Sequence, residues 1–264
     1  MADTPWVGQQ ADKLYLQSGQ FTSTVKTSQS IGAVDLSPSG ITYDNVNTPW
    51  CGSAADKLYL TSGQFTSTLK DSEAVGAVDA TVQGMSYDGT NTPWCGGEAD
   101  KLYLQSGQFT STVKTSESIG AIDSIPLGIS ADGTNTPWIG AQADKLYLQS
   151  GQFTSTLKTS ESIVGIDATP DGISYDGTNT PWCGISGIKL YLQSGQFTST
   201  LKTSEDISGV DSAVHDICTN DYNERLGISG WTNIASVNGV LQANIGSING
   251  VAKDSIASIN GVAV

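Results

Sequence analysis

A tryptophan recurs at a fixed interval through most of this chain of 264 residues. Each copy follows Thr-Pro, and the copies stand 44 positions apart, at Trp6, Trp50, Trp94, Trp138 and Trp182. The strings KLYL and SGQFTST accompany every copy without a change. Self-similarity with a period of about 20–50 residues is typical of propellers, solenoids and other arrays of one repeated supersecondary unit. The interval of 44 therefore restricts the fold before any other feature is considered.

The content of one copy favours a propeller blade. Four segments of the last complete copy show the alternation, edge proline or tight glycine turn of short strands. They are GISYD (172–176), TPWCG (180–184), KLYLQ (189–193) and FTSTLKT (197–203). No segment has a helical period. Four short strands in 44 residues describe the four-stranded sheet of a propeller blade.

The alternation also orders the strands within a blade. In the first copy, the fourth strand places one set of side chains on one face (Phe21, Ser23 and Val25) and a polar set on the other (Thr22, Thr24 and Lys26). Thr and Lys on an exposed edge oppose edge-to-edge pairing, so we expect this strand to be outermost. The first strand, with Gly at its start, is expected to line the central channel.

The two ends of the array predict that the ring closes on itself. The first copy begins at its second strand, TPWVG, and lacks a first strand. The segment 215–223, which begins 44 residues after Asp171, is a first strand with no TPW after it. Pairing of these two strands completes a fifth blade. We therefore predict an all-β fold, a five-bladed β-propeller over residues 1–226 closed by its N- and C-terminal strands, followed by a β-rich repeat tail over residues 227–264.

The repeat GISYDGTNTPW…DKLYLQSG resembles the blades of the general β-propeller class, and five near-identical blades resemble the tachylectin type of five-bladed lectin. This resemblance covers about residues 4–224. It is architectural, because no sugar-site motif of that family maps onto this sequence residue by residue. It therefore implies a fold and assigns no binding residue.

The charge of the chain restricts its partners. There are 26 acidic against 12 basic residues, a formal net charge of −14. Such a surface repels phosphate backbones, so nucleic acid is not an expected partner. No run of 18 apolar residues exists, so membrane insertion is not expected. The N-terminus MADTPWVGQQ lacks the basic and then apolar stretch of a secretory signal. The protein, synthesised in the host cytoplasm, is therefore expected either to stay inside the cell that makes it or to leave by another route such as lysis.

Three of the four cysteines occupy the position after the repeated tryptophan. Cys51, Cys95 and Cys183 share this position with Val7 and Ile139. A position that accepts Cys, Val or Ile calls for a small buried hydrophobic side chain. No CxxC pair is present, and equivalent positions of different blades should be too far apart to bond. Disulfides and structural zinc are therefore not expected.

Two sets of residues are candidate ligand contacts. The five repeated tryptophans could stack on sugars, but they lie in an inner strand beside a small apolar position, which favours packing between blades. The Asp-Gly-Thr-Asn turns offer side-chain oxygens, but they lack the spaced carboxylates of a calcium loop. Asp and Asn that hold a turn in which Gly has positive φ explain these turns without a ligand. No metal or cofactor is expected. The turn residues are Asp88, Asp132, Asp176, Asn91, Asn135 and Asn179.

The sequence offers little for catalysis. The single histidine, His215, lies in the closing strand, where the other copies have none, and we interpret it as drift in a boundary repeat. No HExxH motif, phosphate-binding loop or GxSxG nucleophile elbow is present. The five copies also keep their symmetry, whereas a reacting centre usually breaks it. We therefore do not expect an enzyme.

The C-terminal tail carries a second repeat. NIASVNGV, NIGSINGV and SIASINGV begin at Asn233, Asn244 and Ser255, with a period of 11. Asn-Gly suits tight turns, which favours short strands over a long helix. An apolar, β-prone segment would aggregate if left exposed, so the tail should pack on its own propeller, on sister tails or on another protein. Its apolar assembly positions are Ile234, Val237, Ile245, Ile248, Ile256 and Ile259.

The INGV-type repeats resemble those at the ends of structural proteins of tailed phages, a resemblance limited to the tail. It implies a non-enzymatic virion structural or surface protein, such as a phage fibre, appendage or decoration protein. Its location would be the virion, and its partners sister subunits or other virion proteins bound through the tail. The alternative is a multivalent carbohydrate-binding lectin with five equivalent sites for surface glycans. The unchanged SGQFTST fits either five copies of one contact or recent duplication.

The copies differ most in the loop between the second and third strands. Because loops carry recognition, a surface diversified for partners would lie there. The variable pairs are Gln9–Gln10, Ser53–Ala54, Gly97–Glu98, Ala141–Gln142 and Ile185–Ser186.

Overall fold

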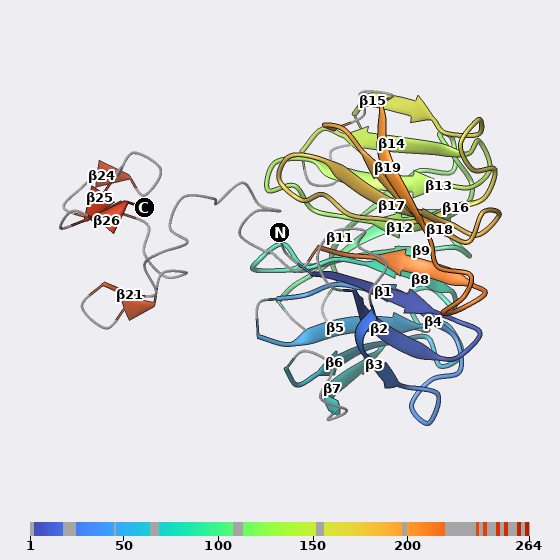
Figure 1. Ribbon diagram of the computed structural model, residues 1–264, viewed down its shortest axis with the longest axis horizontal. Coiled ribbons are helices and arrows are strands. Elements are labelled where there is room, and N and C mark those ends of the chain that lie inside the picture. Colours follow the sequence, from blue (N-terminus) through green and yellow to red (C-terminus); the bar gives the residue numbers. More distant parts are fainter. Residues whose placement is uncertain are drawn as a thin grey trace.

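The computed structural model describes residues 3–17, 25–44, 46–63, 69–107, 113–151, 156–196 and 200–219, and the backbone of six two-residue strands between 236 and 263. Five four-stranded antiparallel sheets follow one another as the blades of a β-propeller (Figure 1). The predicted fold class is confirmed. Within these residues, no helix is long and apolar enough to cross a bilayer.

The strands form four concentric sets. The innermost strands are β4 (Pro38–Ile41), β8 (Val82–Met85), β12 (Pro126–Ile129), β16 (Pro170–Ile173) and β20 (Val214–Ile217). The second set is β1 (Thr4–Gly8), β5 (Thr48–Gly52), β9 (Thr92–Gly96), β13 (Thr136–Gly140) and β17 (Thr180–Gly184). The third is β2 (Lys13–Gln17), β6 (Lys57–Thr61), β10 (Lys101–Gln105), β14 (Lys145–Gln149) and β18 (Lys189–Gln193). The outermost is β3 (Val25–Ser30), β7 (Leu69–Ala74), β11 (Val113–Ser118), β15 (Leu157–Ser162) and β19 (Leu201–Asp206).

The second and third strands lie where the sequence predicts them, whereas the two flanking sets differ. The innermost strand of the fifth blade spans Pro170–Ile173, so the predicted segment 172–176 begins and ends too late. The outermost strand of the first blade runs on to Ser30, beyond the predicted end, and residues 18–24, including Phe21, lie outside the described residues. The outermost strands are mostly exposed, as predicted.

The ring closes by pairing of its two ends. Strand β20 pairs antiparallel with β1, with Trp6 opposite Ile217, so the first blade has the order β20-β1-β2-β3. The Cys218 N–H also donates to the Pro5 carbonyl at 2.9 Å. A hydrophobic cluster joins Trp6 and Val214 to Leu190 of the fifth blade. The predicted closure between the N- and C-terminal strands is therefore confirmed.

Each repeated tryptophan packs between two blades. Trp94 stacks on Tyr103 of the adjacent strand, with ring centroids 4.1 Å apart and an interplanar angle of 17°. The same cluster contains Cys51, Leu58 and Val75 of the preceding blade. Five clusters of this composition surround the axis. The position after the tryptophan is fully buried in every copy, which confirms that it takes a small hydrophobic side chain (Val7, Cys51, Cys95, Ile139 and Cys183).

A buried aspartate ties the connection between two blades to the second of them. These aspartates are 0–5% exposed, and they are Asp35, Asp79, Asp123, Asp167 and Asp211. Asp123 accepts a hydrogen bond from the Tyr147 hydroxyl at 3.1 Å. It also accepts from the N–H groups of Ile125, Gln142 and Ala143, each at 3.1 Å. Hydrogen bonds to a charged acceptor are stronger than neutral ones, and several of them offset the burial of the carboxylate.

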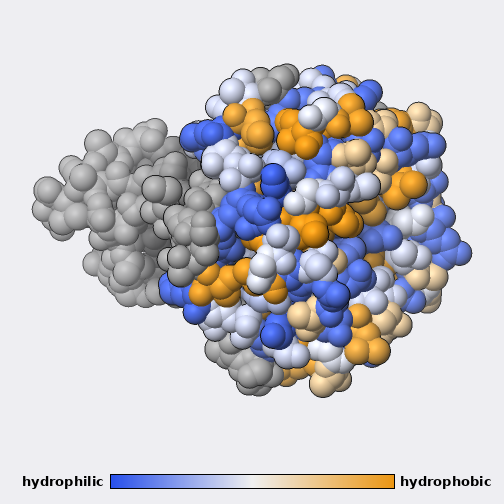
Figure 2. Space-filling view, turned by 45° about the vertical axis from the view of Figure 1, so that its right-hand side comes forward, coloured by the Kyte–Doolittle hydropathy of each residue, from blue (hydrophilic) through white to orange (hydrophobic). Residues whose placement is uncertain are grey.

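Exposed hydrophobic side chains are scattered over the surface. Val34, Leu36 and Val78 lie in blade connections, while Leu69 and Leu157 begin outermost strands. Figure 2 shows one face on which hydrophobic residues are interspersed with hydrophilic ones. Single exposed apolar residues of this kind are normal for folded proteins.

The tail contributes three short antiparallel strand pairs. Strands β21 (Ser236–Val237) and β22 (Val240–Leu241) flank one Asn-Gly pair. Strands β23 (Ser247–Ile248) and β24 (Val251–Ala252) flank the second, and β25 (Ser258–Ile259) and β26 (Val262–Ala263) the third. Short strands at the Asn-Gly pairs were predicted. The predicted boundary at 226/227 and the positions Ile234, Ile245 and Ile256 lie outside the described residues.

The aspartate contact explains why each TPWxG string ends in glycine. A Cβ added at Gly140 would lie 2.4 Å from the carboxyl carbon of Asp123, whereas one added at Gly165 would meet nothing within 4 Å. We expect Gly140→Ala to lower the free energy of unfolding by about 1–3 kcal/mol, because the buried carboxylate must move. The control Gly165→Ala should stay within about 0.5 kcal/mol of the unmodified protein. Urea denaturation measures both, and equal losses would contradict the explanation.

Candidate functional site

In the third, fourth and fifth blades, an Asp-Gly-Thr-Asn turn joins the innermost strand to the second strand. In the third blade, Asp88 Oδ1 accepts from the N–H groups of Thr90 (2.8 Å) and Asn91 (2.6 Å), and the Asn91 amide donates to Asp88 Oδ2 at 3.4 Å. Gly89 has a φ of 96°. The turns at Asp132 and Asp176 repeat these contacts. The turn interpretation of these residues is thus confirmed, and the same bonds fix the orientation of their polar groups.

A tyrosine precedes the turn aspartate in three of the blades. The hydroxyl of Tyr175 donates to the carbonyl of Gly177 in its own turn at 2.9 Å. Burial raises the pKa of Tyr175, and the carboxylates of Asp132 and Asp176, from two successive blades, raise it further. The pKa of Tyr87 is raised in the same way, by burial and then by two turn aspartates. Tyr87 and Tyr175 are therefore each close enough to the turns of two neighbouring blades to be influenced by their charges.

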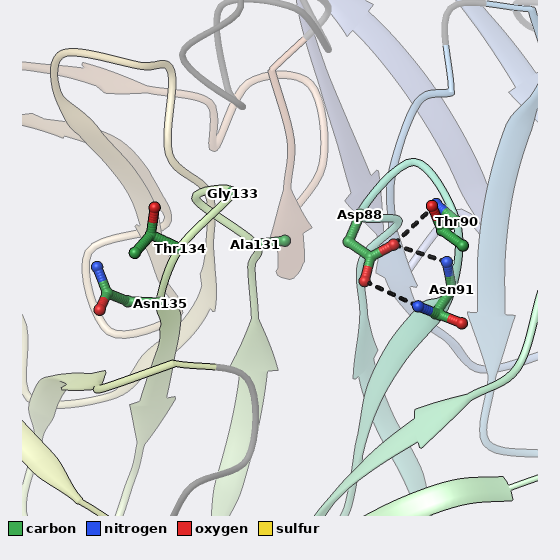
Figure 3. Close-up of a pocket in the computed structure, with 7 residues that line it drawn as sticks. All are labelled: Asp88, Thr90, Asn91, Ala131, Gly133, Thr134 and Asn135. Carbon is green, nitrogen blue, oxygen red and sulfur yellow. Dashed lines mark hydrogen bonds between the residues drawn. The ribbon is translucent and has the colours of Figure 1, made fainter.

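The fourth blade has alanine at this position, and a cleft opens there (Figure 3). The cleft has a volume of about 280 Å³ and lies between the turns of the third and fourth blades. Ala131, which is 5% exposed, forms its floor. The remaining lining is polar or small and comes from both turns: Asp88, Thr90, Asn91, Gly133, Thr134 and Asn135.

The exposure of the turn asparagines reflects the missing tyrosine. Asn47, Asn91 and Asn179 are buried, with 7–8% of their surface exposed. Asn135 is half-buried, and it is the asparagine in the turn that follows Ala131. Its amide donates to Asp132 Oδ2 at 3.0 Å, which uses one of its two N–H groups. The alanine therefore uncovers a polar side chain that is buried in the tyrosine-bearing blades.

The unchanged SGQFTST string contacts these turns. The side-chain amide of Gln196, in the fifth blade, donates to Asp132 Oδ2 in the fourth at 2.8 Å. The Thr92 hydroxyl donates to the carbonyl of Gly107 in this string at 3.0 Å, and Thr136 makes the equivalent bond to Gly151 at 3.1 Å. These hydrogen bonds hold the Asp-Gly-Thr-Asn turns and the strands that follow them, which explains why part of SGQFTST is unchanged. Its central residues lie outside the described part of the chain.

The sequence candidates divide into two groups. Asp88, Asn91 and Asn135 line the cleft, Asp132 adjoins it, and Asp176 and Asn179 belong to the turn against which Tyr175 packs. The repeated tryptophans are 0–1% exposed, with the indole N–H of Trp94 bonded to Gln105 at 3.1 Å. Their candidacy as sugar-stacking platforms is corrected, because no ring face reaches the surface. Sequence reasoning missed Ala131, although ISADG in place of ISYDG marks it.

The opposite end of the ring carries a second break in symmetry. His215 Nδ1 lies 2.8 Å from Asp171 Oδ2 on the adjacent innermost strand. Burial lowers the pKa of His215, but the hydrogen bond and charge of Asp171 outweigh it, so the pKa lies above its ordinary value. The histidine interpreted as drift is therefore an ion-pair partner. The variable loops lie at this end, since Ala54 and Ala55 bond Asp35 of the blade connection.

Asp216 replaces a glycine of the innermost strands. The other four blades have glycine here because a Cβ would meet the next strand; at Gly128 it would lie 2.8 Å from the Asp171 carbonyl oxygen. The carboxylate of Asp216 is 1% exposed and accepts from the Ile41 N–H at 2.8 Å, which joins the closing strand to the second blade. Burial raises its pKa well above the ordinary value, and the backbone donors offset this only in part.

No protein-family model matches the chain, and no curated protein matches it. Among solved structures, it is similar to a chain of a nidogen–laminin complex, with a TM-score of 0.56 and 9% identity over 84% of this chain and 99% of that one. It is also similar to a streptogramin B lyase (TM-score 0.49, 12% identity, 80% of this chain and 67% of that chain) and to a virginiamycin B lyase from Staphylococcus aureus (0.47, 14%, 81% and 74%). The first likeness shows the propeller fold alone, and the two lyases carry no argument about activity.

The buried Asp216 predicts an unusual dependence of stability on pH. Because its pKa is raised in the folded state, the unfolded chain loses this proton first, and stability falls as pH rises above about 3.9. Asp216→Asn keeps an acceptor for the Ile41 N–H and removes the ionisation. We expect it to raise the free energy of unfolding at pH 7.5 by on the order of 1 kcal/mol or more, and by less near pH 5.

Chemical denaturation at the two pH values measures this difference. The control is Asp206→Asn, because Asp206 is exposed and hydrogen bonds from Ser208 lower its pKa, the opposite direction. The free energy of unfolding of this control, relative to the unmodified protein, should not increase as pH rises. If Asp216→Asn lowers the free energy of unfolding at pH 7.5, ionisation of Asp216 does not destabilise the fold and the prediction is wrong.

Proposed function

We propose that this chain is a non-enzymatic recognition protein of a virion surface, such as a phage fibre, appendage or decoration protein. Its propeller is displayed, and its tail joins sister subunits or other virion proteins. The observation that carries the proposal is that the ring is complete before the tail begins. Strand β20 ends at Ile217, and the next two residues make the last described contacts of the ring.

The propeller fold therefore does not require the tail. Residues 220–264 are not needed to pair any edge of the five described blades, since β20 already completes the first. The three strand pairs share one register across an Asn-Gly pair and recur with the 11-residue period. An isolated two-stranded hairpin is marginal in water, so such units gain stability by packing on one another or on a partner. Assembly is the role that suits a repeat of this kind.

Several features support a non-enzymatic role. Burial raises the pKa of the Cys95 and Cys183 thiols well above the ordinary value, which keeps them from acting as nucleophiles. The Ser39 hydroxyl donates a hydrogen bond to the Val82 carbonyl at 3.1 Å. His215 forms an ion pair with Asp171. The described residues contain no group of three or more His, Cys, Asp and Glu side chains able to hold a metal ion.

A lectin function is the second candidate, and the cleft at Ala131 favours it. Asp, Asn and Thr side chains held in fixed turns suit the hydroxyl groups of a glycan, and the net charge of −14 disfavours nucleic acid. The five-fold equivalence that a symmetric lectin would need does not hold at this position, since tyrosine replaces alanine in three blades. The two functions are compatible, because a virion surface protein can bind glycans.

Removal of the tail tests the display function. We expect a variant that lacks residues 228–264 to keep the far-UV spectrum and cooperative melting of the propeller, because the ring closes by Thr219. It should lose self-association or incorporation into particles. Light scattering gives the mass of both proteins, and particle purification gives their incorporation. If mass and incorporation are unchanged, the assembly role of the tail is wrong.

A further inference from the structure

We propose that the cleft over Ala131 is a binding site for one neutral pyranose ring, and that each propeller carries it between the third and fourth blades rather than five times. This inference rests on the recognition function proposed above and gives that function a site and a ligand class. It depends on a comparison of equivalent positions within the same ring.

The equivalent positions show what the cleft is shaped to hold. Tyr43, Tyr87 and Tyr175 place a hydroxylated six-membered ring at this position, and Thr219 occupies the fifth, next to residues outside the described part of the chain. The Tyr175 ring lies near the carboxylates of two blades, and its hydroxyl bonds the Gly177 carbonyl at 2.9 Å. In the fourth blade, Gly133 occupies the position of Gly177. A ligand ring over Ala131 would therefore lie where a neighbouring blade places its own ring, with a hydroxyl within reach of the Gly133 carbonyl.

The walls favour a sugar over a phenol. Asp88 and Asn91 line the cleft on one side and Thr134 and Asn135 on the other, with the apolar Ala131 between them (Figure 3). The polar side chains of this lining include both hydrogen-bond donors and acceptors. Among the described residues, the Asn135 side-chain amide donates only to Asp132, which leaves its second N–H for a ligand. A pyranose has hydroxyl groups around its whole edge to meet such walls, whereas a phenol has one. Polar groups held by other hydrogen bonds need no reordering when they bind.

Size and charge narrow the ligand further. A volume of about 280 Å³ lies just below the range of about 300–1,000 Å³ that is usual for drug-sized ligands, so it suits one ring of a glycan. The Asp88 carboxylate in the wall and the net charge of −14 repel anionic sugars. The class is thus a neutral hexose or N-acetylhexosamine, and uronic and sialic acids are excluded.

The test uses the full chain and two opposite substitutions, one that fills the cleft and one that opens a second cleft at an equivalent position. Ala131→Tyr installs the residue of three other blades and should fold while it fills the cleft. Tyr175→Ala should open a second cleft between the fourth and fifth blades. The probes are the methyl glycosides of glucose, galactose and mannose, and N-acetylglucosamine, with glucuronic acid and p-cresol as the anionic and phenolic comparisons. Titrations followed by ¹H–¹⁵N NMR give the affinity and the position of each site.

We expect a neutral pyranose to bind with a dissociation constant in the range of about 1 mM, and to shift the amides of residues 88–91 and 131–135. In Ala131→Tyr the affinity should fall by at least about tenfold, with melting unchanged. In Tyr175→Ala, new shifts should include residues 175–179. Retention of sugar binding in Ala131→Tyr, shifts confined to the variable loops, binding of p-cresol alone, preference for glucuronic acid, or no binding by any probe would each overturn the proposal.

The two proposals fail separately. If no neutral sugar binds but removal of the tail abolishes assembly, the site is wrong and the display function stands. If sugar binds at the cleft while removal of the tail changes neither mass nor incorporation, the site stands and the display function is wrong.

Discussion

The arrangement of the blades depends on one buried carboxylate per connection. Asp123 and its four counterparts each receive a tyrosine hydroxyl and backbone N–H groups of the blade that follows. These hydrogen bonds fix the position of each blade connection, because burying a carboxylate without such partners would be costly. The glycine that ends TPWxG and the tyrosine of KLYL are both explained by this contact. The hydrophobic clusters then fill the space that the aspartates have fixed.

Against this repeated frame, the departures from symmetry fall in two places. At one end, Asp171, His215 and Asp216 tie the closing strand to both of its neighbours. These contacts hold the closing strand in place where the ring is not continuous in sequence, since the first blade alone is built from both ends of the chain. At the other end, Ala131 replaces the tyrosine of three other blades, and a cleft lies over it. Departures from a repeated pattern that open a cleft are where functional sites are expected, which is the basis of the site proposed above.

Much of the fold could be predicted from the sequence, and the reasons are physical. The period, the edge proline and the glycine turns are local, so the second and third strands and the closure followed from them. The bounds of the innermost strands did not, because the close approach of Gly128 to the next blade is a tertiary contact. The turn residues of the site were recognised by their chemistry. Ala131 was not, because its meaning depends on the Asp88 turn across the cleft.

The two proposals together set how many binding sites an assembly would present. A single cleft per ring would give a weak sugar contact, so in the proposed assembly avidity would come from the number of rings held together and not from the five blades. The chain leaves the ring at Thr219, beside Tyr175 and thus on the same end as the turns that form the cleft. The 13 residues between Thr219 and the first tail motif at Asn233 can span at most about 45 Å.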